Sequence, residues 1–190
     1  MYKRQGNTFV RRTEIEKADL LGERLVGGAS ETATIIMEEM GKRYNVGFRD
    51  GNGAQQFLIE VIAFYMHLVD VFAFGILGLE KREIFGDRLA VAVVRELLRE
   101  LSRDTSADDF GETLRDTYNR RQMEYARYKV HIPANEKPLK NTLYWEFSKI
   151  LFGMMDDTNP ARLMFLNVLV ADMTNMMLNV ALKVEEVLRS

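Results

Sequence analysis

Three ionisable residues stand in the most apolar run of the chain and are the first candidates for chemistry. Glu60, His67 and Asp70 interrupt the apolar segment that closes with YMHLVDVFAFGIL. At about 100° per residue in a helix, Glu60 and His67 point within roughly 20° of each other, and Asp70 lies roughly 60° further round. His67 and Asp70 are also i,i+3 neighbours, which touch on a helix surface. The three side chains are therefore expected to share one stripe.

A second polar stripe occurs near the end of the chain. Asp172, Asn175 and Asn179 fall within about 60° of one another on a helix. If the two helices face each other, the two stripes meet in one polar layer. This layer is the candidate ligand site or polar seam of the protein.

Two functional interpretations of the layer involve chemistry. The first is a single metal ion held by Glu60, His67, Asp70 and Asp172. A two-metal site is disfavoured, because bundles build one from about four carboxylates and two Glu-x-x-His pairs, and this chain has 2 histidines. The second is acid–base catalysis, since burial raises the pKa of a carboxyl group and a neighbouring carboxylate keeps a histidine charged. No nucleophile is recognisable beside these residues.

The third interpretation is structural, and the sequence favours it. Buried charges normally find hydrogen-bonding partners. Arg82, Arg88 and Arg95 follow at positions from which they can reach Glu60 or Asp70. A polar layer of this kind fixes the register of a bundle. No cofactor is expected under this interpretation.

The glycine-rich stretch Arg49–Gly53 invites two motif interpretations, and both fail. As a calcium loop starting at Asp50, it has Ala54 where an oxygen ligand is needed and Val61 in place of the bidentate glutamate. As a phosphate loop, it lacks the third glycine and follows no strand. A helix end followed by a turn explains the glycines. The chain also contains no G-x-x-x-x-G-K-[ST], H-E-x-x-H or G-x-S-x-G pattern.

The segment RDTYNRRQMEYARYK mixes basic residues with tyrosines, which is the composition of a single-stranded nucleic-acid platform. Its candidate contacts are Arg120, Arg121, Arg127 and Lys129. The tyrosines, however, recur at helical spacing, which favours inward packing and leaves the arginines on a solvated face. Nucleic-acid binding is therefore not expected.

Methionine and phenylalanine are concentrated in the C-terminal third. The residues concerned are Trp145, Phe147, Phe152, Met154, Met155, Met164, Phe165, Met173, Met176 and Met177. Methionine fills irregular gaps in cores and is favoured on surfaces that fit several partners. Three interpretations stay open: core packing, a surface for a protein partner or second subunit, and an apolar pocket.

Composition limits the class of protein. With 190 residues, 26 basic and 28 acidic side chains, and no cysteine, the chain is expected to form one domain without disulfides or thiolate metal sites. The N-terminus has no apolar signal region, so a cytoplasmic location is expected. The apolar run Phe57–Leu79 contains three ionisable residues, and each central charge costs about 2.5–3.5 kcal/mol on insertion scales. No membrane span is expected.

Helical periodicity and capping signals divide the chain, and no segment shows strand alternation. Thr13 and Glu16 are spaced as a capping box, and Asn159 with Pro160 pairs a helix cap with a first-turn proline. Asn45 and Gly47 suit a left-handed helix end. Helices are predicted over residues 13–26 and 30–44 (or one bent helix over both), 54–77, 80–102, 107–129, 139–155 and 160–188.

The expected fold is all-α. Residues 1–12 are predicted to form a flexible basic arm, and residues 13–190 a single-domain bundle of six or seven mostly antiparallel helices. Helices 54–77 and 160–188 are apolar on nearly every side, which predicts central positions or a subunit interface. The favoured function is a non-enzymatic interaction protein acting as a homodimer. The alternative is a pocket protein that binds a small apolar ligand or one metal ion at the polar seam.

Overall fold

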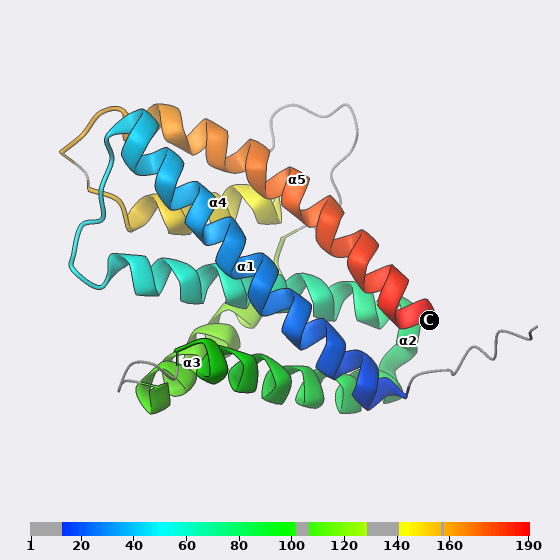
Figure 1. Cartoon of the computed structure of the whole chain (residues 1–190). Helices are drawn as coiled ribbons and strands as arrows, with labels where there is room; N and C mark the ends of the chain where they lie inside the picture. The colour runs from blue at the N-terminus through cyan, green and yellow to red at the C-terminus, as the bar shows by residue number, and fades with distance from the viewer. Residues whose placement is uncertain (1–12, 102–106, 129–140, 157) are drawn as a thin grey trace, which may run out of the picture.

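The computed structural model confirms the all-α fold (Figure 1). It describes residues 13–101, 107–128, 141–156 and 158–190, with the side chains of residues 101, 107–109, 167 and 171–178 not described. The predicted arm 1–12 and the interval between the predicted helices 107–129 and 139–155 lie outside these ranges. The helices are α1 (Glu14–Tyr44), α2 (Gly53–Leu101), α3 (Ala107–Tyr125), α4 (Leu143–Gly153) and α5 (Arg162–Arg189).

α1 is one continuous helix, which resolves an alternative that the sequence leaves open. Its N-terminus has the predicted capping box: the backbone N–H of Glu16 donates to Thr13 Oγ1 at 3.3 Å, and the N–H of Thr13 donates to Glu16 Oε2 at 2.7 Å. Its C-terminus ends at Asn45 in the left-handed conformation, with φ 50° and ψ 41°. The two central glycines do not interrupt it, because flanking alanines and leucines bury one face of the helix in the core.

α2 consists of two helices joined at Gly78, in agreement with the predicted boundary between helices 54–77 and 80–102. Gly78 has φ 74° and ψ 179°, a combination that is essentially restricted to glycine. We refer to residues 53–77 as the first segment of α2 and to residues 79–101 as the second segment. In the first segment, residues 59–70 are all buried, as expected for a central helix.

The first segment of α2 is the hub of the bundle. α2 contacts all four other helices, and α5 packs against α1, α2 and α4. α1 crosses the second segment closely, since a Cβ added at Gly22 would lie 2.6 Å from the Cβ of Ala92. α2 is long and apolar enough to cross a membrane, but 78% of its most apolar window is buried inside the protein. The same test is passed by the core helix of a soluble protein.

Two loops meet at one end of the bundle in a contact that the sequence did not predict. Phe48 and Met155 form an isolated antiparallel bridge. The N–H of Arg49 donates to the carbonyl of Met154 at 3.0 Å, and the N–H of Asp156 donates to the carbonyl of Gly47 at 3.0 Å. This bridge ties the α1–α2 turn to the α4–α5 turn and accounts for the backbone groups left between the helices.

Two predicted helix starts are wrong by a few residues. α4 begins at Leu143 rather than 139, because Asn141 has φ 66° and Thr142 is the extended N-cap. α5 begins at Arg162 rather than Pro160. The side chain of Asn159 accepts from the N–H of Ala161 at 2.9 Å, so the asparagine closes a tight turn that precedes the helix.

Candidate functional site

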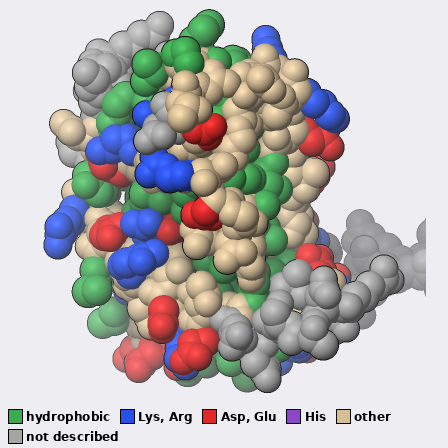
Figure 2. Space-filling view, turned by 90° about the vertical axis from the view of Figure 1, so that its left-hand side faces the viewer, with side chains coloured by type: hydrophobic (Ala, Val, Ile, Leu, Met, Phe, Trp, Pro, Cys, Tyr) green, Lys and Arg blue, Asp and Glu red, His purple; other side chains and the backbone are tan. Residues whose placement is uncertain are grey.

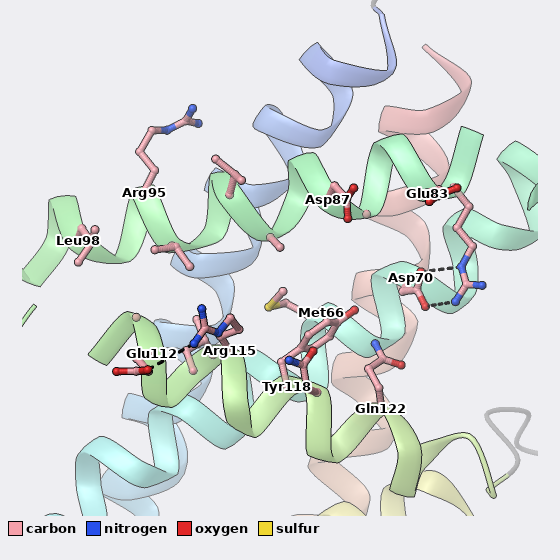
Figure 3. A pocket seen from close by; sticks show the side chains of 18 of the residues that line it. Met66, Asp70, Glu83, Asp87, Arg95, Leu98, Glu112, Arg115, Tyr118 and Gln122 are labelled. Atoms are coloured by element: carbon pink, nitrogen blue, oxygen red, sulfur yellow. Dashed lines mark hydrogen bonds and ion pairs between the residues drawn. The ribbon is translucent and has the colours of Figure 1, made fainter. Parts of the chain in front are cut away.

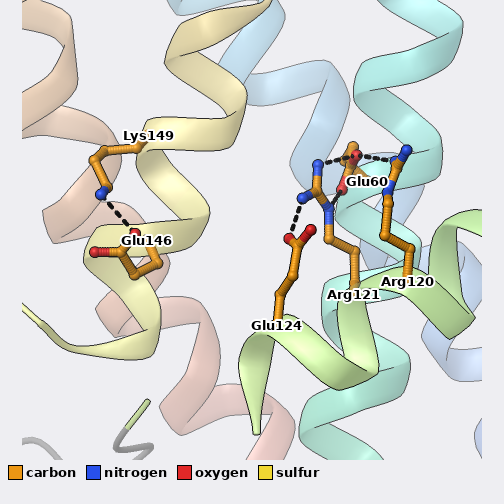
Figure 4. A network of polar contacts seen from close by, with 6 residues as sticks. All are labelled: Glu60, Arg120, Arg121, Glu124, Glu146 and Lys149. Atoms are coloured by element: carbon orange, nitrogen blue, oxygen red, sulfur yellow. Dashed lines mark hydrogen bonds and ion pairs between the residues drawn. The ribbon is translucent and has the colours of Figure 1, made fainter. Parts of the chain in front are cut away.

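Glu60 lies inside an ion-pair cluster with α3 (Figure 4). Its carboxylate accepts from Nε and Nη2 of Arg121 at 2.7 Å and 2.6 Å, and from Nη2 of Arg120 at 3.3 Å. The side chains of Glu60 and Arg121 are 4% and 14% exposed. Arg121 also binds Glu124 on its outer side. A bidentate arginine–carboxylate pair of this kind is both strong and geometrically specific.

His67 is held two turns further along the same helix. Its Nδ1 lies 2.8 Å from Oε1 of Gln122, and its ring centroid lies 5.1 Å from that of Tyr125. Burial lowers the pKa of His67 below its ordinary value, and the contact with Gln122 and the charge of Asp70 only partly offset this effect. The imidazole is therefore neutral at pH 7, and its Nδ1–H donates to Gln122.

Asp70 of the first segment of α2 binds Arg82 of the second segment, on the other side of the break at Gly78. Nε and Nη2 of Arg82 donate to its two carboxylate oxygens at 2.8 Å and 2.5 Å. The guanidinium also lies 5.3 Å from the ring centre of Phe74. Arg82 is one of the three arginines expected as partners. The other two, Arg88 and Arg95, instead bind Asp19 of α1 at 2.7 Å and 3.3 Å.

Among the described residues, Glu60 and His67 contact α3, and Asp70 contacts the second segment of α2. Asn179 of α5 is exposed and lines a separate small hollow with Thr32 and Tyr65, so it does not join Glu60 or His67. The side chains of Asp172 and Asn175 lie outside the described part of the chain. Within that part, no three carboxylate or imidazole groups are placed to share a metal ion. The described part of the seam consists of the ion pairs Glu60–Arg121 and Asp70–Arg82 and, between them along the helix, the neutral pair His67–Gln122.

Sequence reasoning missed the two residues of α3 that complete this layer. Helical spacing predicts a solvated face for Arg121, which is also a candidate nucleic-acid contact, yet its side chain points inward to Glu60 (Figure 4). Gln122 was not singled out. A spacing signal was present, because Leu114, Tyr118, Arg121 and Tyr125 recur every three or four residues and thus share one face.

The other candidate nucleic-acid contacts form no basic surface. Arg120 and Arg127 are exposed, and Lys129 lies outside the described residues. On the face of the molecule in Figure 2, basic and acidic side chains are interspersed. Nucleic-acid binding relies on positive charge gathered on one face.

Part of the methionine- and phenylalanine-rich set packs inside the domain. Phe147 and Met155 are 0% exposed, and Phe165 is 1% exposed. Met164 is 67% exposed, and the side chains of Met173, Met176 and Met177 are not described. Core packing thus accounts for Phe147, Met155 and Phe165, whereas Trp145 and Phe152 are half-buried.

A large groove lies beside the seam, between the second segment of α2 and α3 (Figure 3). Its volume is about 1380 Å³. Its apolar lining includes Met66, Ala90, Val94, Leu98, Leu114 and Tyr118. Burial raises the pKa of Tyr118 to about 12, so the hydroxyl on the groove wall stays protonated. His67 does not line the groove, whereas its partner Gln122 does.

We expect the free energy of unfolding to fall as the pH drops below about 6.5, the ordinary pKa of histidine. The unfolded chain takes up a proton there, whereas folded His67, with its lowered pKa, does not. The contribution of His67 to the free energy of unfolding is fully present above that pH, and it is lost as the pH falls towards the pKa of His67 in the folded protein. Each unit by which the pKa of His67 is lowered contributes about 1.4 kcal/mol to this loss of stability.

Urea unfolding of the wild type and of His67→Gln over this pH range measures the loss. Equal pH slopes in the two proteins would contradict the expectation.

Comparisons with known proteins do not relate this chain to a protein family. No protein-family model matches the chain, and neither the search of curated proteins nor the search of solved structures gives a match.

Proposed function

We propose that this is a non-enzymatic interaction protein that binds an amphipathic α-helix of a protein partner in the groove between the second segment of α2 and α3. The polar seam then serves to position the two walls. Arg121 and Gln122 fix α3 against the first segment of α2, and Arg82 fixes the second segment against Asp70. A buried ionic layer is best attested in such a registering role.

One observation carries the proposal: the second segment of α2 has a second apolar stripe that the described chain leaves largely exposed, and Val91 and Leu98 of this stripe line the groove. Ile84 and Val91 are 60% and 56% exposed, and Leu98 is half-buried. These three residues, spaced by seven, lie about 140–180° round the helix from the core residue Leu89. Val94 lies beside them on the groove wall. A heptad-spaced stripe is the pattern that packs against another helix.

The dimensions of the groove also suit a helix better than a small molecule. Ligand pockets usually enclose about 300–1,000 Å³, and this groove exceeds that range. The wall from residue 79 to residue 98 is about 29 Å long at 1.5 Å per residue. Gly86, Ala90 and Gly111 line it, and small residues of this kind allow a helix backbone to approach.

The charges on the groove define the face that the partner must present. Glu83 and Asp87 stand together towards one end (Figure 3), and neither has an ion-pair partner in the described part of the chain. Unpaired acidic residues beside an apolar stripe favour a helix that carries lysine or arginine next to its apolar face. A small apolar ligand, the alternative drawn from the sequence, makes no use of these carboxylates.

The absence of native cysteine allows a direct test by labelling. Val91→Cys places one thiol on the stripe, and Ile35→Cys on α1 is a matched control because both residues are 56% exposed. Both variants are treated with a maleimide inside the producing cells and again after purification and strong dilution. At about 90% occupancy, labelling of Val91→Cys in cells should be about tenfold slower than in dilute protein. The control should react alike in both.

Equal reactivity of the two thiols under both conditions would overturn the proposal, because it would mean that the stripe is uncovered in the cell. Protection that persists in pure protein diluted until it sediments as a monomer would also overturn it, because the thiol would then be covered by its own chain. Protection in cells that disappears on purification and dilution supports a helix partner.

A further inference from the structure

We infer that the basic N-terminal arm of this chain docks at the acidic end of the groove, where Lys3 and Arg4 bind Glu83 and Asp87. The arm comprises residues 1–12, which precede the described part of the chain. The inference rests on the proposed function and adds its regulation, because the arm and a partner helix then compete for the same two carboxylates.

Two carboxylates of the groove wall lack a cation. Glu83 and Asp87 line the groove one helical turn apart (Figure 3), and like charges at this spacing destabilise a helix. The basic residues nearest to them in sequence are engaged elsewhere, since Lys81, Arg82 and Arg88 each bind a different carboxylate. Among the described residues, none forms an ion pair with Glu83 or Asp87. A cation brought to this end of the groove would therefore stabilise the second segment.

The arm carries cations without competing acids. Its sequence, MYKRQGNTFVRR, contains Lys3, Arg4, Arg11 and Arg12 and no acidic residue. Lysine and arginine have long side chains, so Lys3 and Arg4 can reach two carboxylates that lie about 6 Å apart along a helix. Charge pairs that form in a hollow are screened less by salt than pairs on an open surface. The complementary charge favours docking of the arm at this end of the groove.

The arm joins the described chain at the same end of the groove. Thr13 is the N-cap of α1, and the next residue, Glu14, accepts from Nζ of Lys81 at 2.8 Å. Lys81 stands at the start of the second segment, where the groove wall begins with Leu79. The N-terminal end of α1 and the bend of α2 lie at one end of the bundle (Figure 1).

The arm is long enough to reach the two carboxylates. α1 packs on the opposite side of the second segment, since Ala92, which Gly22 of α1 closely approaches, lies about 180° round the helix from Glu83. The arm must therefore pass round half of a helix about 10–12 Å in diameter, a path of about 17 Å at the helix surface. The chain from Lys3 to Thr13 extends over up to about 33 Å. It therefore reaches the groove with length to spare.

Docking makes the arm a competitor of the partner helix. A helix that uses Glu83 and Asp87 must displace the arm, and its apparent affinity falls in proportion to the fraction of molecules whose groove is free. Val91 stands one further turn along the wall, beyond the two carboxylates. A Val91→Cys thiol is therefore expected to react freely in the diluted monomer, with or without the arm.

Crosslinking within one chain tests the docking. Gln5→Cys adds a thiol to the arm and keeps all its charges. Gly86→Cys adds another between Glu83 and Asp87, where an added Cβ meets no other atom within 4 Å. With a short bismaleimide, this pair is expected to react about tenfold faster than Gln5→Cys with Gly27→Cys on α1. Products at the mass of one chain are counted, at a dilution at which the chain sediments as a monomer.

Gly27→Cys is a matched control for Gly86→Cys. Gly27 is also a helical glycine at which an added Cβ has free space. It lies about 21 Å from Thr13 along α1, a distance that the chain from Gln5 to Thr13 can span. An arm that is not docked would therefore react with both positions.

Charge reversal identifies the contact. Lys3→Glu with Arg4→Glu is expected to abolish the tenfold preference, and so is Glu83→Lys with Asp87→Lys. All four changes together should restore it, because the charges are then exchanged between the arm and the wall. Each variant is checked for the helical circular dichroism of the wild type.

Labelling in cells tests the competition. Val91→Cys is combined with Lys3→Glu and Arg4→Glu, which frees the groove of the arm. If the arm occupies the groove about 90% of the time, its release raises the apparent affinity for a partner helix about tenfold. Labelling of the thiol in the producing cells is therefore expected to become about tenfold slower than in the chain with the unchanged arm. Unchanged labelling would overturn the competition.

Three results overturn the docking. One is equal crosslinking at Gly86→Cys and Gly27→Cys, and another is an exchange of all four charges that fails to restore the preference. The third is an equal loss of preference in Arg11→Glu with Arg12→Glu, because net charge alone would then attract the arm. If the docking fails while Val91→Cys is protected in cells, the proposed function stands without this regulation. If the docking holds while Val91→Cys is not protected in cells, the arm alone occupies the groove and the proposed function fails.

Discussion

Replacing Glu60 with alanine is expected to lower the free energy of unfolding by about 3–5 kcal/mol. The change removes the carboxylate but leaves Arg121, whose side chain is 14% exposed, without its main partner in the interior. A buried charge that has lost its partner bears the full cost of its removal from water. Since domains are stable by about 5–15 kcal/mol, the loss is a large fraction of the total. Urea unfolding followed by circular dichroism measures it.

Two further variants separate this explanation from general damage to the core. Arg120→Ala removes the outer partner of Glu60. Because the side chain of Arg120 is 57% exposed, this variant should lower the free energy of unfolding by no more than about 1 kcal/mol. The double variant Glu60→Leu with Arg121→Met replaces both charges by apolar groups, and it should recover most of the loss. If the double variant is no more stable than Glu60→Ala, burial of the unpaired arginine is not the cause.

Replacing Phe64 with alanine is expected to cost about 3–5 kcal/mol as well, for a different reason. Phe64 is 0% exposed. Its ring stacks on Phe147 of α4 with centroids 3.9 Å apart, and it meets Tyr125 of α3 edge-on at 5.8 Å. Truncation leaves a cavity where three helices meet, and the surrounding rings are too large to collapse into it. Thermal and urea unfolding at pH 7 report the effect.

Phe74 provides a control of the same residue type on the same helix. It is 49% exposed and contacts the guanidinium of Arg82, so Phe74→Ala should cost about 1 kcal/mol or less. Comparable losses at the two positions would show that burial does not determine the effect. A small loss at Phe64 alone would mean that the aromatic layer is not tightly packed.

The fold was predictable from sequence where local signals agree with the global pattern. The predictions of the capping box at Thr13, of the left-handed helix end at Asn45 and of a break between residues 77 and 80 are all confirmed. Helix starts near prolines and turns were less accurate. The i→i+3 bonds after Asn159 compete with helix start there, and sequence spacing does not separate the two.

In the candidate site, the residues of the first segment of α2 were predictable from the sequence, but their partners were not. The shared stripe of Glu60, His67 and Asp70 follows from helical periodicity within one element. Their partners depend on which helix packs opposite, and this is a long-range property that no local pattern records. Arg121 shares a face of α3 with Leu114, Tyr118 and Tyr125, but the structure alone shows that this face lies against Glu60. The groove likewise arises from the spacing between helices.

The backbone conformation of Gly78 determines whether α2 is a pair of helices joined at an angle or one straight helix. Its backbone angles, φ 74° and ψ 179°, are the only interruption in a 49-residue helix, and an alanine at this position would favour helical angles instead. The straightened helix would be about 73 Å long and would carry the second segment and α3 away from α1 of the same chain. Those surfaces would then lose their contacts within the chain, so the closed fold depends on the backbone angles that Gly78 allows.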